Sequence, residues 1–323
     1  MKVCIISHSS VDPRQQFFYE ELSKYAEILV LSPKKWGKQT AKSEQKKNYQ
    51  LVALPVESEP LMGSYTFSYK ALAHLGNFAP HIVLCQNEFW CNQTWLSHLW
   101  AEQLTCLFVV FAWENLRPYT PEERALIKKT DLIICGSKKA QEMVSVSNDH
   151  TVRLPQTGVN TDLFKPMNIR KKGELVFVGR RVPEKGYDMV QNLGYEVVMP
   201  NDVPYEEMPT IYNKGLIHVA PSYAIPRWVE QNMPYSNAEA LSCGVPCVTT
   251  RSGAIPEYLE DCPGVVLIPE KDEGILKDVV DHLLSDKDGL KEMGRAGREW
   301  VLKNYSNKVI AKRLIQILEE VLL

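Results

Sequence analysis

Two cations follow the first apolar strand predicted in the second half of the chain. Residues 174–178 read Glu-Leu-Val-Phe-Val, and Gly179, Arg180 and Lys185 come directly after them. Ligands of a parallel sheet bind at the carboxyl ends of its strands, so these two charges predict a phosphate site at that edge. The alternative is a solvated surface turn in which Pro183 starts a helix.

A second polar segment, residues 231–246, leads into a predicted helix. Tyr235, Ser236 and Asn237 lie at its start and Glu239 lies one turn in. Unpaired N–H groups at a helix start favour a phosphate, and the Glu239 carboxylate can accept hydrogen bonds from two adjacent ribose hydroxyls. The alternative is structural, because Ser236 and Glu239 also match a capping box in which Glu239 caps its own helix.

Composition narrows the class of protein. The 323 residues are long enough for two α/β domains, and a net charge of −2 gives no global attraction to nucleic acid. The eight cysteines lie mostly in apolar runs, which predicts buried, reduced thiols and a cytoplasmic protein. The sequence contains no apolar run long enough for a membrane helix, and residues 1–7 are too short for a signal peptide.

Short apolar runs alternate with helical patterns along most of the chain, which predicts βαβ units in doubly wound parallel sheets. Strands are expected at 3–7, 28–32, 82–85, 106–111, 132–135, 175–178, 195–199, 217–219, 247–250 and 265–268. Helices are expected at 13–24, 94–101, 121–129, 138–144, 185–192, 205–213, 238–242 and from 277 onward, and residues 33–81 read as a polar span. The predicted domains are 1–165 and 166–302, with 303–323 a helix returning to the first domain.

Five short motifs occur in a fixed order. They are Thr157-Gly-Val-Asn-Thr-Asp-Leu-Phe164 with Pro166, the 179–186 block, Pro221-Ser222, Glu239-Ala-Leu-Ser-Cys-Gly-Val-Pro246, and Ser252-Gly253 with Pro256-Glu257. Together they resemble the group 1 (family 4) retaining glycosyltransferases of GT-B fold, from about residue 131 to residue 257. The resemblance implies two Rossmann-like domains facing across a cleft, with C-terminal helices packing back on the domains.

The resemblance assigns roles to the residues of the second domain. It implies that Arg180 and Lys185 bind the donor diphosphate and act in catalysis, that Gly179 before them also belongs to the donor site, and that Glu239 binds the ribose. It assigns diphosphate-binding N–H groups to Tyr235, Ser236 and Asn237. An earlier glutamate contacts the donor sugar in the family, seven residues before the ribose-binding one. Here that spacing leads to Gln231, while Glu230 lies one residue further away, so either residue can fill the role.

Polar clusters in the first domain predict an acceptor site. Glu88 follows strand 82–85; Trp113, Glu114 and Asn115 follow strand 106–111; and His8 follows the first strand. Aromatic rings stack on sugar faces and carboxylates bind sugar hydroxyls; the alternative is loop packing. The segment from His8 to Pro13 also replaces the glycine-rich loop that relatives carry at this point.

The predicted function is transfer of a hexosyl group, with retention, from a nucleotide-diphosphate sugar to a saccharide or glycolipid acceptor. No metal or other cofactor is expected, because cations and helix N–H groups can stabilise the leaving diphosphate. Asp286 and Asp288 form the only Asp-x-Asp and read as a polar turn. The alternatives are a non-catalytic nucleotide-sugar-binding subunit or sensor, and a nucleotide-sugar epimerase.

One lysine-rich span suggests a possible membrane contact. Lys34, Lys35, Lys38, Lys42, Lys46 and Lys47 lie close together, opposed only by Glu44. The usual interpretation of such a span is a solvated loop. A lipid-linked acceptor on an anionic leaflet would give it a use, with the protein peripheral at the inner membrane face.

Overall fold

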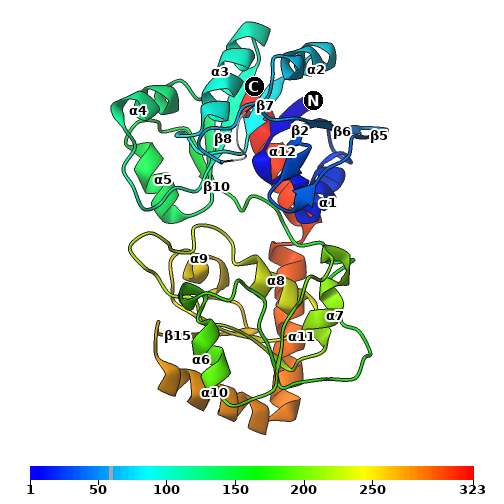
Figure 1. Ribbon diagram of the computed structural model, residues 1–323, viewed down its shortest axis with the longest axis vertical. Coiled ribbons are helices and arrows are strands. Elements are labelled where there is room, and N and C mark those ends of the chain that lie inside the picture. The colour runs from blue at the N-terminus through cyan, green and yellow to red at the C-terminus, as the bar shows by residue number, and fades with distance from the viewer. Residues whose placement is uncertain (58–60) are drawn as a thin grey trace. The chain divides into compact units, whose positions relative to one another are not determined.

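A computed structural model describes residues 1–57 and 61–323 and divides the chain into two compact units (Figure 1). The first contains Met1–Thr157 together with Ile310–Leu323, and the second contains Gly158–Val309. In Figure 1 the elements from the blue N-terminus to the blue-green helix α5 (Lys138–Ser145), together with the red C-terminal helix, belong to the first unit. Each unit has its own mainly parallel sheet covered by helices, so the predicted α/β class is confirmed.

The sheet of the first unit has the strand order β10-β9-β8-β7-β1-β2-β6-β5. Neighbouring strands are parallel except at the edge, where β5 runs antiparallel to β6. The strands are β1 (Lys2–Ile6), β2 (Glu27–Pro33), β5 (Glu44–Lys46), β6 (Tyr49–Leu54), β7 (Ile82–Cys85), β8 (Leu107–Ala112), β9 (Leu132–Cys135) and β10 (Thr151–Arg153). A separate hairpin pairs β3 (Lys35–Trp36) with β4 (Gln39–Thr40).

Local signals in the sequence start the helices of this unit. The Asp12 side chain accepts from Arg14 N ahead of α1, and Thr120 and Glu123 form a reciprocal capping box on α4. The helices are the 3₁₀ turn η1 (His8–Val11), α1 (Pro13–Leu22), α2 (Lys70–Phe78), α3 (Asn92–Leu104), α4 (Pro121–Lys128), α5 (Lys138–Ser145) and α12 (Asn307–Leu322). Successive residues of β1, such as Cys4 and Ile5, are both fully buried, which places apolar material on both faces of the sheet.

The second unit repeats this plan with a five-stranded parallel sheet in the order β12-β11-β13-β14-β15. The strands are β11 (Leu175–Val176), β12 (Val197–Val198), β13 (Ile217–Ala220), β14 (Cys247–Thr250) and β15 (Val265–Ile268). The helices are η2 (Pro183–Lys185), α6 (Tyr187–Asn192), η3 (Tyr205–Glu207), α7 (Met208–Asn213), α8 (Tyr235–Ser242), α9 (Ile255–Leu259), α10 (Glu273–Ser285) and α11 (Lys287–Asn304).

Alternate residues of these strands enter two different cores. Val176 and Cys247 pack with α7 and α8 residues, whereas Leu175 and Val248 pack with residues of α6 and α10. Helices therefore cover both faces of the sheet, as a doubly wound domain requires.

The structure differs from the sequence-based expectation at two places. The span 33–81 is not merely polar, because it contains β6, whose Tyr49 and Leu51 are buried beside β2. The predicted strand at 175–178 ends at Val176. The expectation for the cysteines is confirmed: all eight are free, and Cys106 alone is not fully buried. Asp286 caps α11 through Gly289 N, as a polar turn between helices requires.

The chain passes between the units twice, and the two passages are bonded to each other. Val159 N donates to Tyr305 O and Asn307 N donates to Val159 O, each at 2.8 Å. A Cβ added to Gly158 would lie 2.6 Å from Asn307 N, so only glycine allows this approach. Helix α12 starts at this crossing, and from Ile310 onward it belongs to the first unit.

Candidate functional site

Lys185 and Glu230 form an ion pair in the second unit. Lys185 ends η2 in the loop after β11, and its Nζ forms an ion pair with Glu230 Oε1. The same ammonium lies 4.4 Å from the centroid of the Trp228 ring. Both partners are largely buried, with side chains 23% and 16% exposed. Of the two residues left open by the spacing argument, Glu230 is the one that contacts the predicted phosphate-binding lysine.

Two motif glycines let the segments of this ion pair pack closely. Gly186 has φ +69°, and a Cβ there would overlap the Pro221 carbonyl. Gly253 has φ +50°, and a Cβ there would overlap the backbone of Glu230, whose carbonyl accepts from Ala254 N at 3.0 Å. The 179–186 motif therefore packs on Pro221 and the 252–257 motif packs on the segment that carries Glu230, and in each contact the glycine leaves no side chain in the way.

Arg180 differs from Lys185 in its surroundings. Its side chain is 62% exposed, and its guanidinium lies 3.7 Å from Glu184 Oε1 within the same loop. A surface pair of this kind contributes little free energy, so Arg180 can exchange Glu184 for an anionic ligand at low cost. Gly179 before it has no positive φ, and a Cβ there would meet only the Phe177 ring at ordinary distance.

Glu239 does not cap its helix. Helix α8 begins at Tyr235 behind Pro234, which has no side-chain acceptor, and the Glu239 carboxylate lies inside the unit, 2% exposed. Its Oε1 accepts from the Tyr205 hydroxyl at 3.0 Å and its Oε2 accepts from the Tyr212 hydroxyl at 2.9 Å. The capping-box alternative is therefore wrong, and the two tyrosines are site residues that the sequence analysis missed.

The first turn of α8 carries the other predicted residues of this segment. Ser236 and Tyr235 are half-buried, whereas Asn237 is buried and its carbonyl accepts from the Cys247 thiol at 3.5 Å. The helix therefore starts three residues earlier than the predicted 238–242, and its first N–H groups belong to the segment that the sequence analysis selected.

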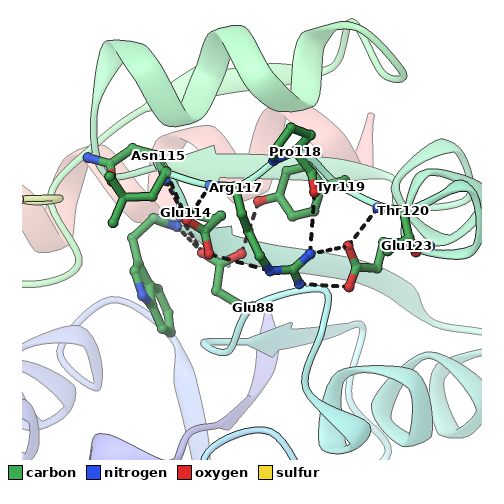
Figure 2. A network of polar contacts seen from close by, with 10 residues as sticks. Glu88, Glu114, Asn115, Arg117, Pro118, Tyr119, Thr120 and Glu123 are labelled. Atoms are coloured by element: carbon green, nitrogen blue, oxygen red, sulfur yellow. Dashed lines mark hydrogen bonds and ion pairs between the residues drawn. The ribbon is translucent and has the colours of Figure 1, made fainter. Parts of the chain in front are cut away.

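In the first unit, Glu88 is the centre of a buried network (Figure 2). Its Oε1 accepts from the backbone N–H groups of Trp113 and Glu114, the latter at 2.6 Å, and its Oε2 accepts from the Tyr119 hydroxyl at 2.9 Å. The side chain is fully buried, and this burial raises the pKa of Glu88 to about 7 even though the three donors favour its charged form. Glu88 therefore holds the loop after β8.

Glu114 and Arg117 make further hydrogen bonds that fix the conformation of the same loop (Figure 2). Glu114 Oε1 accepts from the N–H groups of the next three residues at 2.9–3.2 Å. Arg117 pairs with both carboxylate oxygens of Glu123 at 2.7 and 3.1 Å, and Glu123 also caps α4 with Thr120. The predicted residues Trp113 and Asn115 remain half-buried on this fixed loop.

His8 belongs to an aromatic group that includes one other predicted residue. Its ring centroid lies 6.3 Å from that of Trp113, and 5.2 and 6.2 Å from those of Trp36 and Tyr65. Nδ1 of His8 lies 2.8 Å from Asn87 Oδ1, and burial lowers the pKa of His8 below its usual range. Trp36 and Tyr65 were not predicted as site residues, because both lie in the 33–81 segment, which reads as a polar span.

Within residues 1–57 and 61–323, no group of three or more His, Cys, Asp or Glu side chains has an arrangement suited to a metal ion. None of the helices described is both long enough and apolar enough to cross a bilayer.

Sequence comparison connects these features to known proteins. Residues 153–286 match the profile of the family described as glycosyl transferases group 1. A GDP-mannose-dependent alpha-(1-6)-phosphatidylinositol monomannoside mannosyltransferase of Mycolicibacterium smegmatis is 29% identical over 133 residues, 40% of this chain and 35% of that protein. A GDP-mannose-dependent monoacylated alpha-(1-6)-phosphatidylinositol monomannoside mannosyltransferase of Corynebacterium glutamicum is 35% identical over 208 residues, 64% and 53% of the two chains. The chain thus spans roughly a third to a half of these two relatives.

Structural comparison covers nearly the whole chain. The crystal structure of Anabaena HepE in complex with UDP aligns with a TM-score of 0.72 at 12% identity, covering 99% of this chain and 100% of that one. At this identity the likeness establishes the fold alone. Residues 153–286 match the glycosyl transferases group 1 family, and the chain that carries this match has the GT-B fold.

Proposed function

We propose that this protein is a retaining glycosyltransferase that moves a hexosyl group from a nucleotide-diphosphate sugar to a saccharide or glycolipid acceptor without a metal ion. The observation that carries the proposal is the ion pair between Lys185 and Glu230, both of which lie in the segment that matches the group 1 family. Glu239 and the start of α8 lie in the same segment. Relatives named as GDP-mannose-dependent mannosyltransferases support a nucleotide sugar as donor.

Lys185 is the proposed catalytic cation. A donor diphosphate would replace Glu230 as its partner, leaving the Glu230 carboxylate to accept hydrogen bonds from hydroxyls of the donor sugar. Arg180 and the first N–H groups of α8, from Tyr235 to Asn237, would complete the diphosphate site. Negative charge on the diphosphate grows as the bond to the anomeric carbon breaks, so these groups bind the transition state more tightly than the ground state.

The proposed reaction needs no protein nucleophile. The acceptor oxygen forms a bond to the anomeric carbon on the face that the diphosphate leaves, and the departing phosphate oxygen takes the acceptor's proton. This sequence of steps retains the configuration of the sugar.

For the acceptor we propose the aromatic group around His8 and Trp113 together with Glu114 and Asn115. Trp113 offers a ring for a sugar face, while Glu88 supports the acceptor site from inside by fixing the loop. A lipid-linked acceptor and a cytoplasmic position at an anionic membrane surface fit the exposed side chains of Lys34, Lys35, Lys38, Lys42 and Lys47. Trp36 among them packs on Tyr65 at 5.0 Å, so the lysines would make that contact without it.

A transfer assay tests the proposal. The protein is incubated with a panel of UDP- and GDP-linked hexoses, with and without saccharide and glycolipid acceptors, in the presence of EDTA. We expect slow donor hydrolysis that acceptor converts to transfer, with retained configuration by NMR. Nucleotide sugar epimerised without acceptor would favour the epimerase alternative. Strict dependence on a divalent cation would contradict the metal-free mechanism.

A further inference from the structure

Both carboxylate oxygens of Glu239 are engaged by tyrosine hydroxyls. Tyr205 donates to Oε1 and Tyr212 donates to Oε2, at 3.0 and 2.9 Å. A ribose with its two adjacent hydroxyls would donate the same kind of hydrogen bond to the same two atoms. The tyrosines therefore present to Glu239 the chemistry of the ligand that the proposed function requires.

The two tyrosines are held very differently. Tyr212 lies on α7, is 0% exposed, and packs edge-on against Phe164 and His218 with ring centroids 5.9 and 5.6 Å apart. Tyr205 is half-buried on the three-residue turn η3, with its ring centroid 5.3 Å from that of Phe164. Moving Tyr212 would open the core, whereas moving Tyr205 requires only a local rearrangement of a short turn.

A ligand can reach Glu239 only if something covering it moves, because the residue is 2% exposed. We propose that the Tyr205 hydroxyl takes the place of one ribose hydroxyl on Glu239 Oε1 in the free protein and leaves when nucleotide binds, while Tyr212 stays and positions the carboxylate. The inference rests on the proposed function, because it names the residues that control ribose recognition at the same site.

The exchange of the Tyr205 hydroxyl for a ribose hydroxyl has an energetic reason. A carboxylate removed from water is costly unless it accepts hydrogen bonds, and Tyr205 supplies one when no nucleotide is bound. A nucleotide with a ribose hydroxyl at this position replaces the Tyr205 hydrogen bond at small net cost in free energy. A ligand without that hydroxyl gains nothing from Glu239 Oε1, so Glu239 favours ribose, while the Tyr205 hydroxyl competes with the ribose hydroxyl and limits this preference.

Isothermal titration calorimetry on the full chain tests this with two kinds of probe. The first is UDP or GDP, whichever binds the wild type more tightly, and the second is the 2′,3′-dideoxy form of the same nucleotide. The variants are Tyr205→Phe and Tyr212→Phe. The matched control is Tyr195→Phe, which removes another tyrosine-to-carboxylate bond in the same unit, that to Asp281 at 2.5 Å.

Tyr205→Phe removes the competing donor, so we expect the ribonucleotide to bind between about two and ten times more tightly. Tyr212→Phe loses the positioning bond and should weaken ribonucleotide binding by a similar factor. Neither change should alter dideoxynucleotide binding, and Tyr195→Phe should alter neither affinity.

An unchanged or reduced preference for ribose over dideoxyribose in Tyr205→Phe would overturn the inference. Thermal melts check that each variant is folded, and Tyr205→Phe decides the matter by itself should Tyr212→Phe unfold. A wild-type protein that binds none of the nucleoside diphosphates would contradict the proposed function instead, so the two failures can be told apart.

Discussion

The Lys185 ammonium is held by a carboxylate and an aromatic face, and its side chain is 23% exposed. Its charge is therefore already partly desolvated, and an anionic ligand that replaces Glu230 has little hydration left to remove. This arrangement favours an electrostatic role that becomes strongest as charge accumulates on a leaving group.

Lys185→Ala should lower turnover more than donor affinity. Because the diphosphate gains charge in the transition state, we expect kcat to fall by at least about a hundredfold, a loss of roughly 3 kcal/mol, while the donor Kd rises less than tenfold. Steady-state kinetics and calorimetry measure the two. Lys277→Ala is the matched control, since Lys277 also pairs with a carboxylate, Asp281, and lies over a tyrosine ring. Equal losses in kcat and affinity would assign Lys185 to ground-state binding.

Glu88 should make stability depend on pH. Its pKa is raised from 4.5 to about 7 in the folded protein, so between these values the native state binds more protons than the unfolded state. Stability is then lost as pH rises from about 4.5 to about 7, by on the order of 3 kcal/mol for this group. Glu88→Gln has no titrating group here, and urea unfolding at pH 5 and pH 7.5 should show a smaller decrease than in the wild type. The same decrease in both proteins would refute the assignment.

At the scale of elements, the loops of the site depend on backbone packing. Gly253→Ala introduces a Cβ against Glu230 and Val229 at a positive φ, so the segment carrying Glu230 must shift. We expect a loss of about 1–3 kcal/mol in unfolding free energy together with a large loss of transfer activity.

Gly194→Ala is the control for this change. Gly194 has φ +79° but no atom within 4 Å of the added Cβ, so it reports backbone strain without a clash. It should cost stability of about 1 kcal/mol and leave activity intact. Equal activity in the two variants would show that the position of Glu230 does not depend on Gly253.

The regular elements were largely predictable because each is a short apolar run bounded by turn residues. The strands 82–85, 132–135, 247–250 and 265–268 were found at their observed limits. Strand β6 was missed because its apolar residues follow a lysine-rich stretch and alternate with Gln50, which hides their burial in the sheet. Sheet pairing with β2 stabilises it, and no local pattern reports that pairing.

Residues of the candidate site could be proposed from the sequence where a motif fixes them, but not where folding brings distant side chains together. Glu239 was found from its helix start, but Tyr205 and Tyr212 lie about 30 residues earlier in a stretch that reads as helix and core. The only signal was the presence of two tyrosines, whose buried hydroxyls need partners. Glu88 was selected for its place after a strand, yet its internal role depends on the backbone of a loop 25 residues later.

At the scale of the whole molecule, the first unit is completed by the end of the chain. Ile310, Leu314 and Leu318 of α12 are buried, and Lys312 Nζ lies 6.0 Å from the Tyr25 ring centroid. The stability of the first unit therefore depends on a helix that follows all of the second unit in sequence.

Leu314→Ala tests this dependence. Removing a buried leucine side chain should cost about 2–5 kcal/mol, and hydrogen exchange should become faster in β1, β2 and α1 than in the strands of the second unit. Leu302→Ala is the control, since Leu302 is 38% exposed on α11. Faster exchange confined to the second unit would show that α12 does not stabilise the first.

The hydrogen bonds between the two passages of the chain also limit how this protein can be engineered. Residues 158–309 are an insertion within the first unit, and the backbone bonds between Val159 and the 305–307 segment join the insertion's two ends to each other. A chimera in which the second unit comes from another protein must therefore take the whole of residues 158–309 from that one protein. Both ends of the insertion, at Val159 and at 305–307, then keep their backbone hydrogen bonds to each other. If only one end were exchanged, any residue other than glycine at position 158 would clash with the backbone of Ser306 and Asn307, and the hybrid would be destabilised at this junction.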